Sequence, residues 1–405
     1  MRVRIGVAGT GSIFRGAHLP AYLSIPEAKL YAFYDSVPQK AEEAREIAKK
    51  LYEEEAKRAE EMGNIEKAKT LREDAKDFRV LSSFEGLCEN VELVDICTPP
   101  NTHSKLAIEA LERGVNVMCE KPMALTYLDC LEICEAVERT GRLYQHNENF
   151  IFDSLWYSLR KTVEGGIVGE PLLMIIPAAH GGPEWASWFW QGEIAGGGAL
   201  LDNGIHAITC AWFIIGLDKE PVMVEAVPPV GIRTMIKKRI IEGKYEEVKV
   251  EDKGHILIRF EDKITGHWAS ALVEGSWYYQ DTPQMSLIGS KGIVQIKFPW
   301  EEGGPALTFI DGKGNKFSIP VEGVGGFVGE IRNMVKCVLR GERSISDERM
   351  GAESQAIVGS AYMSQGLGRA VSLKEFKEFA LRLKEEKKDK ASAELLRQQL
   401  EWIAR

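Results

Sequence analysis

The amino-acid sequence predicts an α/β protein with two domains. The first is built on a parallel sheet, and the second is an α+β domain with a large, mostly antiparallel open sheet. The chain has 405 residues, too many for one ordinary hydrophobic core. Short apolar runs alternate with helical patterns as far as residue 147, and strand-like alternation with short glycine turns follows. We therefore expect domains at residues 1–147 and 148–405.

The first domain begins with a strand in VRIGVAG, followed by a helical stretch in HLPAYLSIP and a strand in KLYAFYD. After a charged region come strands in FRVLSS, VELVDICT and VNVMCEK, with a helix through SKLAIEALERG. Strands that alternate with helices form βαβ units, whose sheet is parallel. We place the boundary to the second domain near a loop, GRLYQHNENF.

Two highly charged segments are predicted to be helical. Residues 39–77 consist mostly of Ala, Glu, Lys and Arg and are interrupted at Gly63-Asn64, which indicates two helices. The segment 373–405 ends with an apolar stripe of Leu395, Leu396, Leu400 and Ile403. We interpret both segments as solvated helices with one face packed against a neighbour.

The second domain is predicted to contain a broad sheet. Strand patterns occur in HILIRFEDKITGHWASALVEG, QMSLIGSKGIVQIKF and ALTFIDGKGNKFSIP, with polar or glycine turns between them. A sheet of this kind with one uncovered face commonly pairs with another subunit. We therefore expect a homodimer or homotetramer.

Composition argues against several classes of protein. The formal net charge of −9 disfavours nucleic acid or an anionic membrane as the main partner. The strand at the N-terminus leaves no room for a signal peptide, and no apolar run has the length of a membrane span. The seven cysteines are scattered without a CxxC pair, and Cys130 and Cys134 are poorly spaced on a helix for a disulfide. We expect a cytoplasmic protein without structural zinc or disulfides.

A glycine turn follows the first strand, in GVAGTGSIF. Gly9 and Gly11 allow a sharp turn and the close approach of a pyrophosphate. Ser12 and Ile13 begin a helix whose N–H groups favour an anion. A purely structural turn is the alternative, because the third position of the dinucleotide-binding fingerprint is Phe14.

Asp35 ends the second strand and supports the nucleotide interpretation. A carboxylate there accepts hydrogen bonds from a ribose diol and repels a 2′-phosphate. Two such charges ~4 Å apart repel by roughly 1 to 4 kcal/mol. Ser36 and Val37 follow, so neither position supplies a compensating arginine. The sequence favours NAD over NADP.

A lysine follows the apolar strand in VNVMCEKPMAL. A buried ammonium group is costly unless it is paired or functional. Pro122 ends the strand because it has no N–H to donate. The charge of Lys121 therefore either has a function or is paired with Glu120.

Asp202 and His206 in LLDNGIHAI are spaced i, i+4 and are expected on one face of a helix. A histidine titrates near neutral pH and can accept a proton from a hydroxyl. One alternative is a zinc site, for which the sequence suggests no third ligand. The other is a capping aspartate with a core histidine.

Four segments together resemble the Gfo/Idh/MocA family, named after glucose-fructose oxidoreductase, inositol dehydrogenase and a rhizopine-catabolism protein. They are GTGSIFRGAHLPAY, VDICTPPNTHSKLAIEALERGVNVMCEKPMALT, GGGALLDNGIHAI and GSKGIVQIKF. The resemblance covers essentially the whole chain and is most specific in EKP and GGGxLxDxGxH. It implies an N-terminal Rossmann domain that binds NAD and a C-terminal domain for substrate binding and oligomerisation.

The same resemblance implies roles for the three polar residues. Lys121 stands beside the nicotinamide and bonds the reacting oxygen, where an ammonium stabilises a developing alkoxide. His206 is the general base, and Asp202 positions the substrate or supports the other two.

The residues implied to bind the cofactor are Gly9, Gly11, Ser12, Ile13, Asp35, Thr98, Pro99, Asn101, His103, Glu120, Lys121 and Asn149. His103 is alternatively an ordinary helix-start residue, and Asn101 or Thr102 can cap that helix. Ile151 stands where the family usually has an arginine, which puts a substrate contact from that position in doubt.

The segment HGGPEWASWFWQ is expected to complete the substrate pocket, with the substrate-binding residues His180, Trp185 and Trp188 beside Lys121, Asp202 and His206. The rings of Trp185, Trp188, Phe189 and Trp190 can stack on a sugar, and His180 and Glu184 can bind hydroxyls. The alternative is that these aromatic residues belong to the core or to a subunit interface.

The resulting hypothesis is an NAD-dependent oxidoreductase that transfers a hydride between NAD and a secondary hydroxyl or ketone of a sugar, sugar derivative or cyclitol. One alternative is an NAD-dependent glycosidase that oxidises the sugar transiently. The other is a non-catalytic NAD-sensing regulator, which has no need of Lys121, Asp202 and His206 together. The insert at residues 39–77 is expected to cover the adenine end of NAD or a neighbouring subunit.

Overall fold

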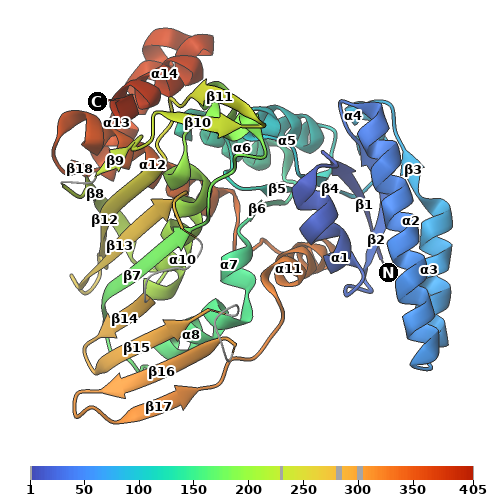
Figure 1. Ribbon diagram of the computed structural model, residues 1–405, viewed down its shortest axis with the longest axis horizontal. Coiled ribbons are helices and arrows are strands. Elements are labelled where there is room, and N and C mark those ends of the chain that lie inside the picture. The colour runs from blue at the N-terminus through green and yellow to red at the C-terminus, as the bar shows by residue number, and fades with distance from the viewer. Residues whose placement is uncertain (1, 229–230, 280–284, 299–303, 405) are drawn as a thin grey trace. The chain divides into compact units, whose positions relative to one another are not determined.

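The computed structural model describes residues 2–228, 231–279, 285–298 and 304–404 and forms two compact units (Figure 1). The first unit consists of residues 1–123, 131–149 and 325–349, and the second of residues 124–130, 150–324 and 350–405. The chain therefore returns to the first unit late in the sequence. The expected ranges 1–147 and 148–405 do not include this return, which no composition change marks.

The first unit contains a six-stranded sheet in the order β3-β2-β1-β4-β5-β6, with every neighbouring pair parallel. Its strands are β1 (Val3–Ala8), β2 (Ala28–Tyr34), β3 (Arg79–Val80), β4 (Leu93–Ile96), β5 (Asn116–Glu120) and β6 (Tyr144–Asn147). This is the strand order of the Rossmann dinucleotide-binding fold, which confirms the prediction for the first domain. The carboxyl ends of all six strands lie at one edge, where such folds bind their ligands.

One local expectation about this sheet was wrong. Residues 144–147 were expected in a loop, but they form strand β6 beside β5. All four side chains are buried. A buried backbone must pair its N–H and C=O groups, and the sheet edge supplies the partners.

The helices and short turns of the first unit connect these strands. They are η1 (Phe14–His18), α1 (Leu19–Tyr22), α2 (Pro38–Glu61), α3 (Ile65–Asp77), α4 (Phe84–Asn90), η2 (Pro100–Thr102), α5 (His103–Glu112), α11 (Gly326–Arg340) and most of α6 (Tyr127–Thr140). The apolar face of α11 joins the core cluster of β1 and β2 through Ile331, Met334 and Val335.

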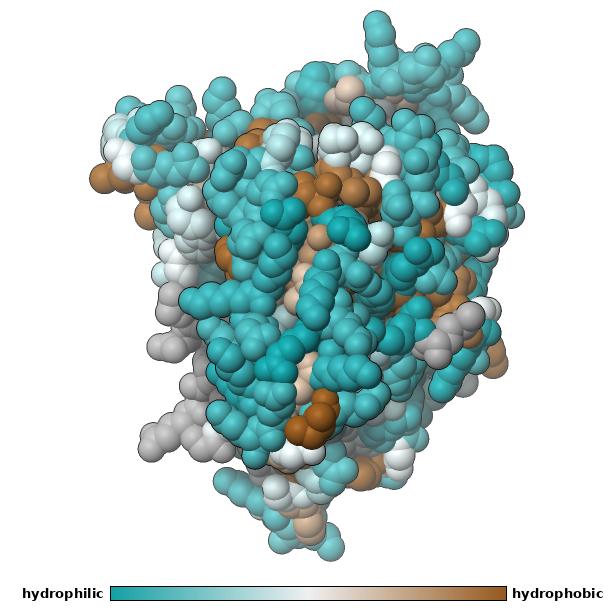
Figure 2. Space-filling view, turned by 90° about the vertical axis from the view of Figure 1, so that its right-hand side faces the viewer, coloured by the Kyte–Doolittle hydropathy of each residue, from teal (hydrophilic) through white to brown (hydrophobic). Residues whose placement is uncertain are grey.

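The charged insert forms two helices, as predicted, and Asn64 caps α3 by accepting a hydrogen bond from the Lys67 N–H. One face of α2 is a row of buried small residues, which lets the helix lie close to its neighbours. They are Ala41, Ala44, Ala48, Ala56 and Ala59. Figure 2 faces α2 and α3 and shows a mostly hydrophilic surface there.

The second unit is built on a ten-stranded sheet, most of which runs β17-β16-β15-β14-β7-β13-β12-β8-β18, with β9 beside β12. Its strands are β7 (Pro171–Ala179), β8 (Glu220–Ala226), β9 (Ile232–Arg233), β12 (Lys253–Glu261), β13 (Trp268–Ser276), β14 (Met285–Gly289), β15 (Gly292–Lys297), β16 (Ala306–Asp311), β17 (Lys316–Ile319) and β18 (Val371–Ser372). All described pairs are antiparallel except β7 with β13. The prediction of a large, mostly antiparallel sheet is confirmed, and Gln284, at the start of one expected strand, lies outside the described residues.

The remaining elements of the second unit are helices, turns and one hairpin. They are α7 (Asn149–Phe152, whose first residue belongs to the first unit), α8 (Ser154–Glu164), η3 (Ser187–Trp190), α9 (Gly192–Ala195), η4 (Leu200–Gly204), α10 (Ile205–Ile215), β10 (Lys238–Ile241), β11 (Lys244–Glu247), α12 (Glu348–Leu367, whose first two residues belong to the first unit), α13 (Leu373–Lys387), η5 (Lys388–Lys390) and α14 (Ala391–Ala404). The charged C-terminal segment is thus two helices joined by a short turn. Leu395 and Ile403 of its apolar stripe are buried.

Helix α10 packs on β7 and β13 and is buried along its whole length. Within the described residues, one helical stretch, Gly192–Ile215, has the length and hydropathy of a membrane span, contrary to the expectation of none. It is 78% buried inside the protein, as expected of a core helix.

The other face of the sheet carries apolar side chains that stay partly exposed in the single chain. They alternate with the buried residues of β7, β12, β13, β14, β15 and β16. They are Leu173, Ile175, Leu257, Leu272, Ile288, Ile293 and Ile310, and we call them the outer apolar face. Strict alternation in register is what gathers them on one side.

Candidate functional site

The glycine turn of the first unit has the geometry that a pyrophosphate requires. Gly9 follows β1 with φ of +88°, a conformation that disfavours any residue with a Cβ. A Cβ at this position would lie 2.7 Å from both the N and the Cγ2 of Thr98, which follows β4. A Cβ at Gly11, in contrast, would meet no atom within 4 Å. The backbone at Gly11 is therefore open to a ligand, and Ser12 beside it is exposed.

Asp35 lies at the end of β2 and its carboxylate holds the glycine turn. One oxygen accepts hydrogen bonds from the Thr10 N–H at 2.9 Å and the Thr10 hydroxyl at 3.1 Å. The other accepts from the Val37 N–H at 3.0 Å. Each carboxylate oxygen can accept more than one hydrogen bond, so Asp35 retains capacity for a ribose diol.

An arginine that the sequence analysis did not consider lies next to this turn. The Nε of Arg15 donates to the Thr10 carbonyl at 2.8 Å, and its guanidinium also pairs with Glu43. Arg15 belongs to the same local segment as the turn, five residues after Thr10, whereas Glu43 comes from α2. Its charge is already partly balanced by Glu43.

The turn after β4 is held by His103. Its ring nitrogens lie 2.8 Å from the Pro122 carbonyl and 2.7 Å from the Thr98 carbonyl. Burial lowers the pKa of His103, although these two contacts act in the opposite direction. The ring is buried and joins the TPPNTH turn to the proline after Lys121, which supports its alternative interpretation as a structural residue.

The other residues of this turn are placed differently. Thr102 stands at the N-cap of α5 but makes no capping hydrogen bond; its hydroxyl bonds Thr98 and the Pro99 carbonyl instead. The expected cap is therefore absent at Thr102. Pro99 and Asn101 are exposed.

Lys121 follows β5 directly and is partly buried. Its neighbour Glu120 is buried, and the Glu120 carboxylate lies 2.8 Å from Nε2 of His18. Glu120 is thus held from within the first unit. Asn149 begins α7, and a Cβ at Gly326, the first residue of α11, would lie 2.2 Å from the Asn149 carbonyl oxygen.

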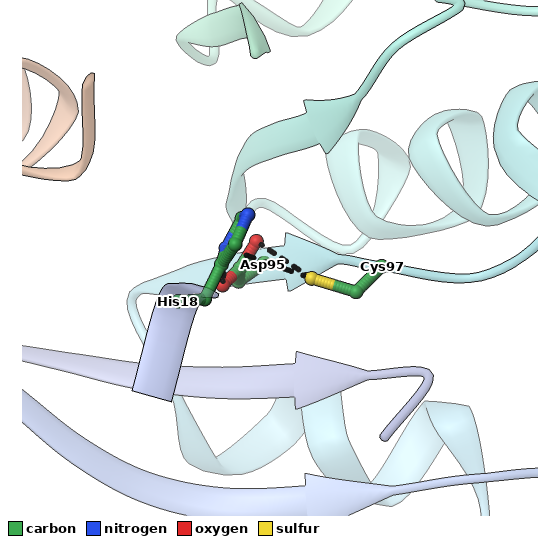
Figure 3. Close-up of side chains that lie close together, drawn as sticks. All are labelled: His18, Asp95 and Cys97. Carbon is green, nitrogen blue, oxygen red and sulfur yellow. Dashed lines mark hydrogen bonds and ion pairs between the residues drawn. The ribbon is translucent and has the colours of Figure 1, made fainter. Parts of the chain in front are cut away.

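His18, Asp95 and Cys97 form a buried cluster in the first unit (Figure 3). His18 Nδ1 is 2.8 Å from Asp95, which also accepts a hydrogen bond from the Tyr22 hydroxyl at 2.7 Å. Cys97 lies 3.4 Å from the second oxygen of Asp95. With a carboxylate at each ring nitrogen, His18 has the surroundings of an imidazolium.

The pKa shifts of the cluster residues are consistent with a charged His18. Burial by itself lowers the pKa of His18, but the charge of Asp95 and the contacts with Asp95 and Cys97 outweigh it, so the pKa lies well above its ordinary value. Burial, with the charge of Glu120, raises the pKa of Glu330 well above its ordinary value. The cluster therefore contacts Glu120, the residue before Lys121.

His18 also belongs to two sets of side chains with metal-ligand atoms. One is His18, Asp95 and Cys97, and the other is His18, Glu120 and Glu330, each within 4.8 Å. Both ring nitrogens of His18 already face carboxylates at hydrogen-bonding distance. The sequence did not suggest these groupings, because four separate segments contribute to them.

In the second unit, Asp202 is held by two donors. Its Oδ2 lies 3.1 Å from Nε2 of His180 and accepts a hydrogen bond of 3.0 Å from the Trp277 indole N–H. The side chain of Asp202 keeps 12% exposure and that of His180 keeps 31%. The structure thus brings together two of the expected substrate-binding residues.

His206 lies four residues after Asp202, in a helical turn of a different type. Asp202 belongs to the π-helical turn η4, whereas His206 lies in α10. The two residues therefore lie on one continuous helical stretch, whose first turn is π-helical. Single π-turns of this kind are frequent at functional sites. The His206 ring is 9% exposed and stacks on Phe150 at a centroid distance of 4.6 Å.

The aromatic segment divides into exposed and buried parts. Trp185 is 64% exposed, and its ring lies 6.0 Å from that of His180. Trp188 stacks on Phe189, while Trp190 is buried against Trp277. Trp185 is therefore open to a ligand beside Asp202, and Trp190 belongs to the core.

Glu184, expected to bind hydroxyls, is occupied by Arg239. The guanidinium bonds Glu184 at 2.6 Å and Asp252 at 3.2 Å and lies against the rings of Trp190 and Tyr278. Two carboxylates face this one cation. The charge of Arg239 is therefore balanced by Glu184 and Asp252.

Ile151, at the position usually occupied by arginine in the family, is 1% exposed. It lies in the core and offers no polar contact. Phe150 and Trp277, which contact His206 and Asp202, were not identified from the sequence. Nothing in their local pattern separates them from other core aromatics; only the pairing of β13 with β7 and β12 places Trp277 at the strand end beside Asp202.

Comparison with known proteins agrees with both units. Residues 3–148 match an oxidoreductase family with an NAD-binding Rossmann fold, GFO/IDH/MocA, and residues 156–295 match a GFO/IDH/MocA C-terminal domain. D-glucoside 3-dehydrogenase of Escherichia coli K12 is 24% identical over 385 residues, covering 92% of this chain and 97% of that enzyme. Myo-inositol 2-dehydrogenase of Thermotoga maritima is 28% identical over 295 residues, covering 72% and 74%.

A solved structure has the same fold. It is levoglucosan dehydrogenase in complex with NADH and levoglucosan, with a TM-score of 0.73 and 20% identity. The similarity covers 92% of this chain and 100% of that chain.

Proposed function

Because the chain belongs to the Gfo/Idh/MocA family of NAD-binding oxidoreductases, we propose that it transfers a hydride between NAD and a secondary hydroxyl or ketone of a sugar, sugar derivative or cyclitol. The relatives named above include glucoside and inositol dehydrogenases. The observation that carries the proposal is the polar group of Asp202, His180 and Trp277, with His206 on the following helix. This group occurs in a chain whose other unit has the dinucleotide-binding strand order.

The proposed chemistry assigns one task to each polar residue. NAD, when bound, supplies the hydride acceptor. His206 takes the proton of the hydroxyl, and Lys121 donates a hydrogen bond to the oxygen that gains negative charge. Asp202, which keeps 12% of its side chain exposed, accepts from a neighbouring substrate hydroxyl. In the reduction of a ketone, His206 returns the proton to the oxygen.

The residues of the first unit fit a dinucleotide. The open backbone at Gly11, with Ser12 and Ile13, would hold the pyrophosphate, and Asp35 would hold the adenosine ribose. We assign the nicotinamide half to Thr98, Pro99, Asn101, Glu120, Lys121 and Asn149, with His103 supporting the turn from behind.

The second unit would bind the substrate. Trp185 offers an exposed ring for the C–H face of a sugar, close to His180. Trp188 extends this surface by stacking on Phe189. We further propose a homodimer or homotetramer that associates through the outer apolar face, because exposed apolar patches on a broad sheet commonly mark such contacts. The seven cysteines are all free, and we further propose a cytoplasmic location.

The proposed function is tested by absorbance at 340 nm with NAD and a panel of neutral glycosides, free sugars and inositols. Accumulation of NADH with at least one of them is expected. Release of nitrophenol from a nitrophenyl glycoside without net NADH would indicate a glycosidase instead. NAD binding with neither reaction across the panel would refute catalysis on these substrates.

A further inference from the structure

A buried glutamate contacts the run of glycines at residues 196–198, which precedes Asp202 and which we call the glycine segment. Glu251 is fully buried, and its carboxylate accepts hydrogen bonds from the Gly198 N–H at 2.8 Å and the Leu200 N–H at 3.1 Å. Leu200 is the first residue of the helical segment η4 and Gly198 lies two residues before it, so neither N–H has an intrahelical partner. The Tyr362 hydroxyl of α12 donates a third hydrogen bond at 2.8 Å.

The backbone of Glu251 holds the same segment. Its carbonyl accepts from the Ala199 N–H at 2.9 Å. A Cβ at Gly198 would overlap that carbonyl, and a Cβ at Gly197 would overlap the Tyr362 hydroxyl. The glycines are therefore required for the close approach of the segment to Glu251 and Tyr362.

This contact leads directly to Asp202. The Gly198 N–H donates to Glu251, and the Gly198 carbonyl accepts from the Asp202 N–H at 2.8 Å. The next residue, Asp252, holds the backbone of Trp277, because the Asp252 carbonyl accepts a hydrogen bond from the Trp277 N–H at 3.0 Å. The Trp277 indole in turn donates to the Asp202 carboxylate.

We propose that Glu251 is a positioning residue, whose ionised carboxylate holds the glycine segment so that Asp202 and His206 stand in the orientation the reaction needs. This inference rests on the proposed function of Asp202 and His206. A displacement of about 1 Å in such a group can lower a rate by roughly 10²-fold.

The charge state of Glu251 gives the inference a measurable signature. Burial raises the pKa of Glu251 to about 7, while the hydrogen bonds from Tyr362 and the glycine segment act against this rise. Tyr362 is the titratable side chain in contact with the carboxylate. The glycine segment contributes backbone groups, and the adjacent Asp252 is engaged by Arg239 and Tyr278. Protonation turns an acceptor into a donor, so the segment loses one of its anchors below about pH 7.

The test compares kcat across pH for the wild type and two variants in the full chain. Glu251→Gln keeps the volume but places an amide N–H₂ against a backbone N–H. We expect kcat to fall about 10- to 100-fold with an unchanged Kd for NAD, and its dependence on this titration to disappear. Tyr362→Phe removes a donor to the ionised form, so the acidic decline of kcat is expected at higher pH than in the wild type.

Amide hydrogen exchange supplies a readout that does not depend on activity. Residues 198–202 are expected to exchange faster in Glu251→Gln, while the exposed control Glu247→Gln leaves both exchange and kcat unchanged. Wild-type exchange in Glu251→Gln, or a loss of kcat matched by an equal loss of NAD affinity, overturns the inference. If Glu251→Gln does not fold, an unshifted acidic decline in Tyr362→Phe overturns it. If the wild type oxidises no sugar, the proposed function fails, and exchange alone still tests the anchoring role.

Discussion

At the scale of single residues, the proposed chemistry depends on groups whose surroundings differ sharply. Asp202 is held by an imidazole and an indole and keeps some exposure, whereas His206 is nearly buried against a phenyl ring. Lys121 follows strand β5, whose last residue, Glu120, is in contact with His18. Each group is positioned by its own unit before any substrate is present, which is what preorganised catalysis requires.

Replacing the proposed base or the proposed oxygen-binding lysine is expected to separate catalysis from cofactor binding. His206→Ala and Lys121→Ala should each lower kcat by about 10²- to 10⁴-fold, because a proton acceptor or a charge beside the developing alkoxide is lost. The Kd for NAD, measured by calorimetry, should change little. His267→Ala, on an exposed loop, is the control. Near-normal rates in both active-site variants would disprove the assignment.

Asp35 is expected to determine the preference for NAD. Asp35→Asn retains an oxygen for the Thr10 N–H but removes the charge that repels a 2′-phosphate. The ratio of kcat/KM for NAD to that for NADP should fall about tenfold or more, since 1.4 kcal/mol corresponds to a factor of ten. An unchanged ratio would show that another group, such as Arg15, controls the preference.

Titration of Glu251 is also expected to make the free energy of unfolding depend on pH. Its pKa rises from 4.5 to about 7 in the folded protein, so the folded state holds a proton that the unfolded state releases. This proton stabilises the folded state fully below about pH 4.5. The stabilisation, roughly 3 kcal/mol in the free energy of unfolding, is lost as the pH rises to about 7. Denaturant unfolding should show this decline in the wild type and not in Glu251→Gln. Parallel curves for the two proteins would contradict it.

At the scale of elements, the glycine segment shows how local sequence and tertiary contact combine. The π-turn η4 follows it, and the N–H groups of Gly198 and Leu200 donate to a carboxylate from a distant part of the chain. Helices α2 and α3, in contrast, needed no such contact to be predicted. Their composition, the Gly63-Asn64 break and the Asn64 cap are all local signals.

Gly198→Ala is expected to damage the segment more than its size suggests. The new methyl group would overlap the Glu251 carbonyl, a backbone atom that cannot rotate away. We expect a loss of at least about 1 to 3 kcal/mol in the free energy of unfolding, with kcat falling as well. The matched control is Gly312→Ala, where a Cβ meets nothing within 4 Å. Equal stabilities of the two variants in urea would show that the glycine segment is not closely packed against Glu251.

At the scale of the whole molecule, the ten-stranded sheet leaves the outer apolar face uncovered within one chain. Leu257 and Leu272 are paired neighbours on β12 and β13 near its centre. A surface of this kind is a liability in water unless another subunit covers it.

Placing charge on this face is expected to dissociate the proposed oligomer. Leu272→Glu should yield a monomer by light scattering, because a buried, unpaired carboxylate at an interface is strongly unfavourable. Ile264→Glu, on a loop residue that is 96% exposed, should leave the mass unchanged. An unaltered oligomer in Leu272→Glu, or a monomeric wild type, would contradict association through this face.

Much of the molecule follows from the sequence alone. The alternation of apolar runs with helical segments predicts the parallel sheet, and the period of two after residue 150 predicts the antiparallel one. The glycine turn, Asp35, EKP and the Asp202–His206 pair indicate an NAD-dependent oxidoreductase. These signals are local, because each depends on spacing within one strand, turn or helix.

Tertiary structure decided the rest. It placed β6 in the first sheet, returned α11 to the first unit, and put Trp277, Glu251 and Arg239 around the segment that carries Asp202. It also buried His18 between two carboxylates from different strands. The physical reason is that these contacts join residues far apart in the chain. Their partners are selected by packing and by the satisfaction of buried polar groups, neither of which leaves a periodic mark in the sequence.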